Sequence, residues 1–225
     1  ELLENHSKDS IAIYIDAHSI SLTPENFSIE FVGTVLWGSQ NKPIVGMPPF
    51  SINHLLKKEK ELNQDAIEHI NTIHNELQKI KPDHKLLLKN AFAFPSAIAK
   101  QQKKNVIVLI DNAEQLLELK NFGAIESVSE YFNDSIAQYV LVSSAVSEMT
   151  AEFPSAESVS VAMLEQKHAE EMVKKEWQNI DKKSMDEMYA LSHGHPFVLS
   201  VLAKKAKGKK HIAKVFYSEL LNVEG

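Results

Sequence analysis

The chain contains no cysteine and no arginine. The lack of cysteine excludes a disulfide framework, a zinc-thiolate site and a cysteine nucleophile, and it fits a reducing, cytoplasmic setting. All 24 basic residues are lysines, so the chain cannot supply an arginine finger to itself or to an identical neighbour. The net charge of −6 also argues against a surface built for nucleic acid, although a lysine-biased genome would explain the missing arginine equally well.

Long apolar runs and phosphate-loop glycines are missing too. No run approaches the roughly 20 apolar residues that a membrane-spanning helix needs, and no signal-peptide pattern opens the chain. Only seven glycines occur, and no G-x-x-x-x-G-K-[ST] motif is formed by any of them. The 225 residues, 44% of them hydrophobic, are enough for one large domain or for a domain with a small appendage.

Three short apolar runs predict strands of a parallel sheet that is buried on both faces. They cover residues 11–15, 106–110 and 139–142, and residues 158–161 are a candidate fourth strand. Because helical patterns alternate with these runs, we expect a doubly wound α/β layer.

Helical spacing of apolar residues accounts for most of the remaining chain. We expect the end of a helix at 1–8, a helix or strand at 27–37, a long helix at 51–80, and a helix at 85–103 interrupted near Pro95. Shorter helices are expected at 113–119 and 125–133, and four more at 166–179, 184–192, 196–206 and 209–222. The sequence therefore predicts an α/β core over residues 1–164 and a small helical lid over residues 165–225.

Polar residues follow the three predicted strands directly: Asp16, Asp111, and the pair Ser143 and Ser144. Ligands of open α/β sheets bind beyond the carboxyl ends of the strands, where a carboxylate can hold hydrated Mg²⁺ beside a triphosphate. An acidic residue also ends many strands simply because a loop begins there, so either interpretation of Asp111 is open. For Asp16 alone, a turn residue is the simpler interpretation.

In their order along the chain, these segments resemble archaeal-type ATPases of the STAND branch of the AAA+ P-loop proteins. The second strand of that family is similar to residues 13–16, its Walker B strand to 105–116, its sensor-1 strand to 139–144, its last strand and first lid helix to 161–177, and the glycine-x-proline turn of its lid to 191–197.

The resemblance implies a nucleotide-binding protein that uses ATP and Mg²⁺. It assigns the Mg²⁺ water shell to Asp111 and catalytic positions to Asn112, Glu114, Ser143 and Ser144. It assigns nucleotide contacts to Asp16, Gly194, His195 and Pro196, between the α/β core and the lid. It also implies that a strand and a phosphate loop precede residue 1, so that the core is incomplete in this chain.

Two departures from the family pattern favour a nucleotide-dependent switch or a slow ATPase over a fast motor. Asn112 stands where the family usually has an acidic general base, and a neutral amide cannot accept a proton in that role. The arginine residues of the usual sensor and finger are missing as well. The rival interpretation is a non-catalytic protein-interaction scaffold on a degenerate ATPase fold, and a protein partner or self-association is expected in either case.

Histidines and lysine clusters have simpler explanations than metal or nucleic-acid binding. His69 and His74 are five residues apart, not the three or four that share one face of a helix, and His193 and His195 lack further ligands nearby in sequence. The lysine pairs at 57–58 and 103–104 and the cluster at 207–210 lie beside acidic residues or at helix ends, which is typical of a solvated face.

Overall fold

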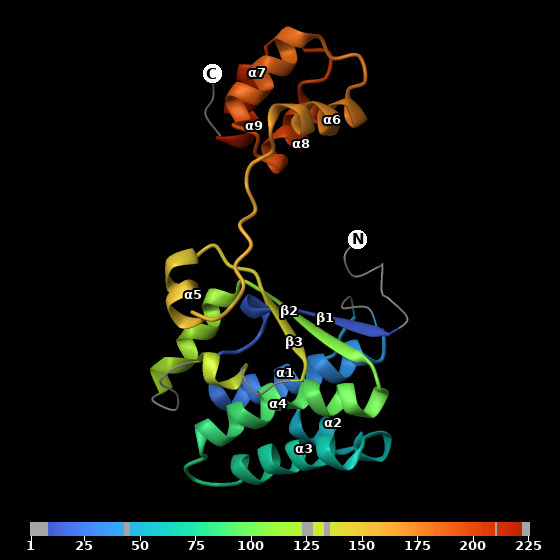
Figure 1. Ribbon diagram of the computed structural model, residues 1–225, viewed down its shortest axis with the longest axis vertical. Coiled ribbons are helices and arrows are strands. Elements are labelled where there is room, and N and C mark those ends of the chain that lie inside the picture. Colours follow the sequence, from blue (N-terminus) through green and yellow to red (C-terminus); the bar gives the residue numbers. More distant parts are fainter. Residues whose placement is uncertain (1–8, 43–45, 123–127, 133–135, 210, 222–225) are drawn as a thin grey trace. The chain divides into compact units, whose positions relative to one another are not determined.

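The structure is a computed structural model and describes residues 9–42, 46–122, 128–132, 136–209 and 211–221. The chain divides into two compact units, Glu1–Ala156 and Glu157–Gly225 (Figure 1). The first unit combines a parallel three-stranded sheet with helices, and the second is helical. The helix end expected at residues 1–8 lies outside the described residues.

The sheet consists of β1 (Ser10–Asp16), β2 (Asn105–Asp111) and β3 (Gln138–Leu141), all parallel and in the order β1-β2-β3. All three predicted strands are confirmed. Side chains alternate between buried and half-buried along β1 and β2, so the prediction of two buried faces is wrong. One face carries the apolar core, whereas Tyr14, Leu109 and Val140 on the other face are half-buried or exposed.

Helices α1 (Pro24–Ser39) and α4 (His84–Gln102) form the layer beneath the buried face, and α3 (Gln64–Leu77) lies on their far side from the sheet (Figure 1). Helix α1 packs on β1, α4 packs on β2, and α3 packs on α4. The rings of Phe27, Phe31 and Phe92 lie 5.2–5.3 Å apart at the centre of this layer. Burying such rings is the main stabilising term for the unit.

The helix expected at 51–80 is divided into α2 (Ile52–Leu56), η2 (Glu59–Glu61, a 3-10 turn) and α3. The division follows from Asn63, whose side chain accepts a hydrogen bond from the Ala66 N–H and so begins α3 anew. Helix α4, in contrast, continues through Pro95. Pro95 and its helix neighbours Phe94 and Ile98 are all buried in the core, so tertiary burial offsets the N–H donor that the proline removes.

After β2 the chain forms two 3-10 helices, η3 (Ala113–Phe122) and η4 (Val128–Tyr131), rather than the expected α-helices. Residues 125–127 and 133 of the helix expected at 125–133 lie outside the described residues. Helix α5 (Val146–Glu152) follows β3. The predicted strand at 158–161 is wrong: this segment has no strand partner within the described residues, and Val159 and Val161 are 80% and 93% exposed.

The C-terminal unit contains α6 (Gln166–Glu176), α7 (Lys182–Ser192), α8 (Pro196–Lys205) and α9 (Ile212–Leu220), each within a few residues of its expected position. Its core is a separate cluster that includes Val173, Met188, Leu199 and Leu202. Across the described ranges, no helix has both the length and the apolar character needed to traverse a bilayer.

Candidate functional site

The carboxyl ends of β1 and β2 bring two carboxylates side by side. Asp16 and Asp111 are direct partners in the parallel register. Each is the last residue of its strand, because the chain then leaves the sheet for a 3-10 turn in both cases. The apolar runs in the sequence predicted both residues as strand ends, but only the register places them opposite each other.

Both oxygens of the Asp111 carboxylate accept a hydrogen bond. The Tyr14 hydroxyl donates to Oδ2 at 2.9 Å, and the Asn112 backbone N–H donates to Oδ1 at 3.0 Å. A carboxylate offers about four acceptor positions, so further positions remain for water or a cation. The carboxylate is therefore held in one orientation while it stays able to bind a ligand.

Asn112 connects the two strand ends. Its side-chain amide donates to Asp16 Oδ1 at 2.9 Å, and the His18 backbone N–H donates to the same oxygen at 3.0 Å. The backbone of Asn112 is left-handed, with φ 52°, a conformation that asparagine tolerates better than most residues. Asn112 thus holds Asp16 in place, which is a role that an acidic residue could not fill beside two carboxylates.

The serine pair after β3 binds Glu114. Ser143 Oγ donates to Glu114 Oε2 at 2.6 Å, and Ser144 Oγ donates to Oε1 at 3.1 Å. The hydrogen bond from Ser143 is the largest cause that lowers the pKa of Glu114, and the bond from Ser144 lowers it further, against a smaller opposing effect of burial. The same turn is tied to the sheet, because the Ala113 N–H donates to the Val142 carbonyl and the Val142 N–H to Ile110.

The strand-end residues suit a hard cation that keeps most of its water. Asp16 and Asp111 supply carboxylate oxygens, which Mg²⁺ prefers. Within the described ranges, no group of three or more histidine, aspartate or glutamate side chains is arranged to hold a metal ion. Any Mg²⁺ here would therefore take its remaining ligands from water or phosphate, as is usual for this ion.

The predicted turn residues Gly194, His195 and Pro196 belong to the C-terminal unit. Gly194 has φ 79° and is buried against the backbone of Leu164, whose N–H donates to the Gly194 carbonyl at 2.9 Å. His195 is the exposed N-cap position of α8, and Pro196 is its first residue. This geometry explains the glycine and the proline by folding alone.

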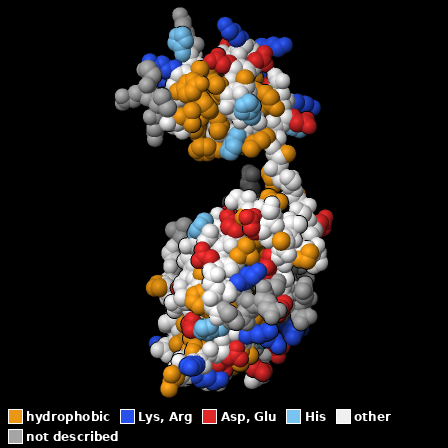
Figure 2. All heavy atoms as spheres, turned by 90° about the vertical axis from the view of Figure 1, so that its left-hand side faces the viewer, with side chains coloured by type: hydrophobic (Ala, Val, Ile, Leu, Met, Phe, Trp, Pro, Cys, Tyr) orange, Lys and Arg blue, Asp and Glu red, His pale blue; other side chains and the backbone are white. Residues whose placement is uncertain are grey.

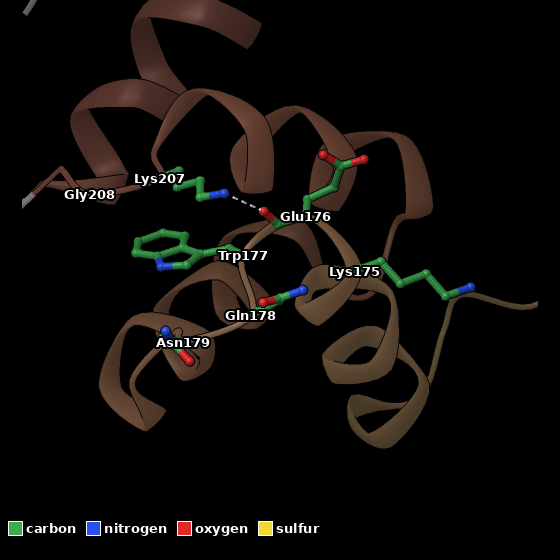
Figure 3. A pocket seen from close by; sticks show the side chains of 7 residues that line it. All are labelled: Lys175, Glu176, Trp177, Gln178, Asn179, Lys207 and Gly208. Carbon is green, nitrogen blue, oxygen red and sulfur yellow. Dashed lines mark hydrogen bonds between the residues drawn. The ribbon is translucent and has the colours of Figure 1, made fainter.

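A hollow of about 520 Å³ lies in the C-terminal unit where α6 and α8 end (Figure 3). It is lined by Lys175, Glu176, Trp177, Gln178, Asn179, Lys207 and Gly208. The Lys207 ammonium donates to the Glu176 carbonyl at 2.8 Å, so it satisfies an orphan carbonyl at the end of α6. Lysines at helix carboxyl ends are expected from the helix dipole, and they do not by themselves indicate a ligand.

Histidines of the N-terminal unit hold helices together. His69 Nδ1 lies 2.8 Å from the amide oxygen of Asn90, which connects α3 to α4, and His84 Nε2 lies 2.7 Å from a carboxylate oxygen of Glu25, which connects α4 to α1. These contacts agree with the structural interpretation of the histidines.

Sequence reasoning missed Tyr14 as a site residue. Its position two residues before Asp16 was the available signal, because residues i and i+2 of a strand share one face of the sheet. Comparison with known proteins gave no matching family model, no similar curated protein and no similar solved structure.

Proposed function

We propose that the N-terminal unit binds a magnesium-nucleotide at the carboxyl ends of its strands and works as a nucleotide-dependent switch or a slowly hydrolysing ATPase. The observation that carries this proposal is the direct pairing of Asp16 with Asp111 at the end of adjacent parallel strands. Ligands of open α/β sheets bind at such an edge. The strand order and the polar strand ends support the resemblance to AAA+ ATPases on which ATP and Mg²⁺ were expected.

In this proposal Asp111 holds the water shell of the ion, and Asp16 adds negative charge beside it. Bound Mg²⁺ would neutralise phosphate charge. Ser143 and Ser144 could face a phosphate only after exchanging their hydrogen bonds with Glu114. Such an exchange would give the unit two states, which is what a switch requires.

Hydrolysis should be slow because the site lacks an effective general base. The Asn112 amide cannot accept a proton, and it is engaged with Asp16. Glu114 could replace it, but its lowered pKa makes the carboxylate a weaker base. The proposal also requires a phosphate-binding loop, and this sequence contains no G-x-x-x-x-G-K-[ST] motif, so other residues would have to supply it. Gly194, His195 and Pro196 stay candidate nucleotide contacts on the resemblance alone.

Thermal melting of the intact polypeptide with and without Mg-ATP tests the proposal. A ligand at about 100 times its dissociation constant stabilises the folded state by about 2.7 kcal/mol. Asp111→Asn should abolish most of this gain, whereas Asp65→Asn, which removes an exposed carboxylate paired with Lys100, should leave it unchanged. No gain in the wild type, or an equal gain in Asp111→Asn, would contradict the proposal.

A protein-interaction scaffold is the second candidate, and exposed apolar side chains favour it. Phe197, Tyr217 and Leu221 of the C-terminal unit are 64%, 46% and 52% exposed, and Figure 2 shows apolar side chains gathered on one face of this unit. Apolar patches of this kind often mark protein interfaces. A scaffold of this kind would show no response to Mg-ATP in the melting experiment.

A further inference from the structure

Tyr14 is the long polar side chain on the half-buried face of β1. It stands opposite Leu109 in the register, two pairs before Asp16 and Asp111. From there its hydroxyl reaches diagonally across to β2 and donates to Asp111 Oδ2 at 2.9 Å. A hydrogen bond from a hydroxyl to a carboxylate is charge-assisted and stronger than one between neutral groups.

We propose that Tyr14 is a positioning residue, whose hydroxyl fixes the Asp111 carboxylate in the orientation that receives a divalent cation. This inference rests on the proposed function, because it takes Asp111 as the carboxylate that faces the cation. Tyr14 and the Asn112 N–H each hold one oxygen of Asp111. Together they fix the carboxylate plane and leave acceptor positions on both oxygens.

Other tyrosines of the chain use their hydroxyls differently. Tyr139 donates to the backbone carbonyl of Phe92 at 2.7 Å, and Tyr189 donates to the backbone carbonyl of Leu164 at 3.2 Å. Those bonds connect segments within a folded unit. The bond of Tyr14 goes instead to a strand-end carboxylate that already has a backbone donor.

The Tyr14 phenol stays a donor at neutral pH. Burial is the largest cause that raises the pKa of Tyr14, and the hydrogen bond to Asp111 and the charges of Asp111 and Asp16 raise it further. Ionisation would place a third negative charge beside two carboxylates.

Outer hydrogen-bond partners of metal-binding groups typically contribute a factor of about 10–100 to metal affinity. Mn²⁺ can serve as a paramagnetic probe of this cation site. We expect Tyr14→Phe, which keeps the ring and removes the hydroxyl, to raise the Mn²⁺ concentration at which the site is half occupied (the Mn²⁺ midpoint) by about 10-fold. Tyr139→Phe is the matched control, because it removes a hydroxyl on the opposite face of the same sheet.

The experiment is an Mn²⁺ titration of the intact polypeptide, followed by paramagnetic broadening of the backbone amide signals of His18 and Asn112. Both amides donate to the strand-end carboxylates, so a nearby ion should broaden them first. Melting temperatures of the three proteins, measured without metal, separate a loss of folding from a change in the cation site. A merely structural tyrosine would change the melting temperature and leave the Mn²⁺ midpoint as in the wild type.

A raised midpoint in Tyr14→Phe, with Tyr139→Phe like the wild type, supports the inference. Equal midpoints in all three proteins overturn it, as does a lack of broadening at His18 and Asn112 in the wild type. Repeating the titration with ATP, with the midpoint expressed as free Mn²⁺ because ATP itself chelates the ion, separates the two proposals. If ATP leaves the wild-type midpoint unchanged, nucleotide binding is refuted while the role of Tyr14 stands.

Discussion

Replacement of Gly194 by alanine should destabilise the C-terminal unit. The Gly194 backbone has φ 79°, and an added Cβ would lie 2.2 Å from the Leu164 carbonyl oxygen and 3.2 Å from the Leu164 carbonyl carbon and nitrogen. Because these atoms belong to the backbone, no side-chain rotation can relieve the overlap. The Leu164 N–H to Gly194 carbonyl bond of 2.9 Å would have to stretch or break.

The expected cost follows from two terms. A left-handed conformation costs about 1–2 kcal/mol for a residue with a Cβ, and losing one intramolecular hydrogen bond adds about 1 kcal/mol. A hydrophobic core of this size rarely provides more than about 3–5 kcal/mol of unfolding free energy. A loss of about 2–3 kcal/mol should therefore lower the melting temperature of the unit by roughly 10–20 °C, at about 4–8 °C per kcal/mol.

Gly208→Ala is the matched control. Gly208 has φ 74° in the same unit, but an added Cβ would meet nothing within 4 Å. Each unit contains one tryptophan, Trp37 or Trp177, so the two indole N–H signals in an NMR spectrum report the units separately during heating. Equal losses of the Trp177 signal in both variants would show that the contact with Leu164 is irrelevant and would refute the reasoning.

Two further predictions concern the N-terminal unit. The buried Tyr131 hydroxyl has no hydrogen-bond partner among the residues that the structure describes, and burial is the main reason that the pKa of Tyr131 rises to about 12. Tyr131→Phe should therefore raise the unfolding free energy by about 1 kcal/mol in urea denaturation, since an unpaired buried hydroxyl costs about that much. A loss of stability would contradict this. Glu114 has a lowered pKa, so its contribution to stability is present above its unfolded pKa of about 4.5 and is lost as the pH falls through the folded pKa. Ser143→Ala should therefore reduce the difference in unfolding free energy between neutral and acidic pH, and an unchanged difference would refute this.

Local patterns predicted most of the elements. The apolar runs before Asp16, Asp111 and Ser143 gave the three strands, because burial of one strand face leaves a clear signal in a short window. The four C-terminal helices were predicted because burial of one helix face leaves apolar residues at helical spacing, which is also a local signal. The strand at 158–161 failed because its alternating pattern is favourable only beside a paired strand, and pairing depends on residues far away in sequence.

The sequence by itself determined which residues end the strands and that Asn112 is not a base. Only the tertiary structure decided how these residues are connected. Tyr14 and Asp111 are 97 positions apart, Asp16 and Asn112 are 96 apart, and Glu114 and Ser143 are 29 apart. The register of parallel strands sets such pairs, and register is a property of the whole packed sheet rather than of any one segment.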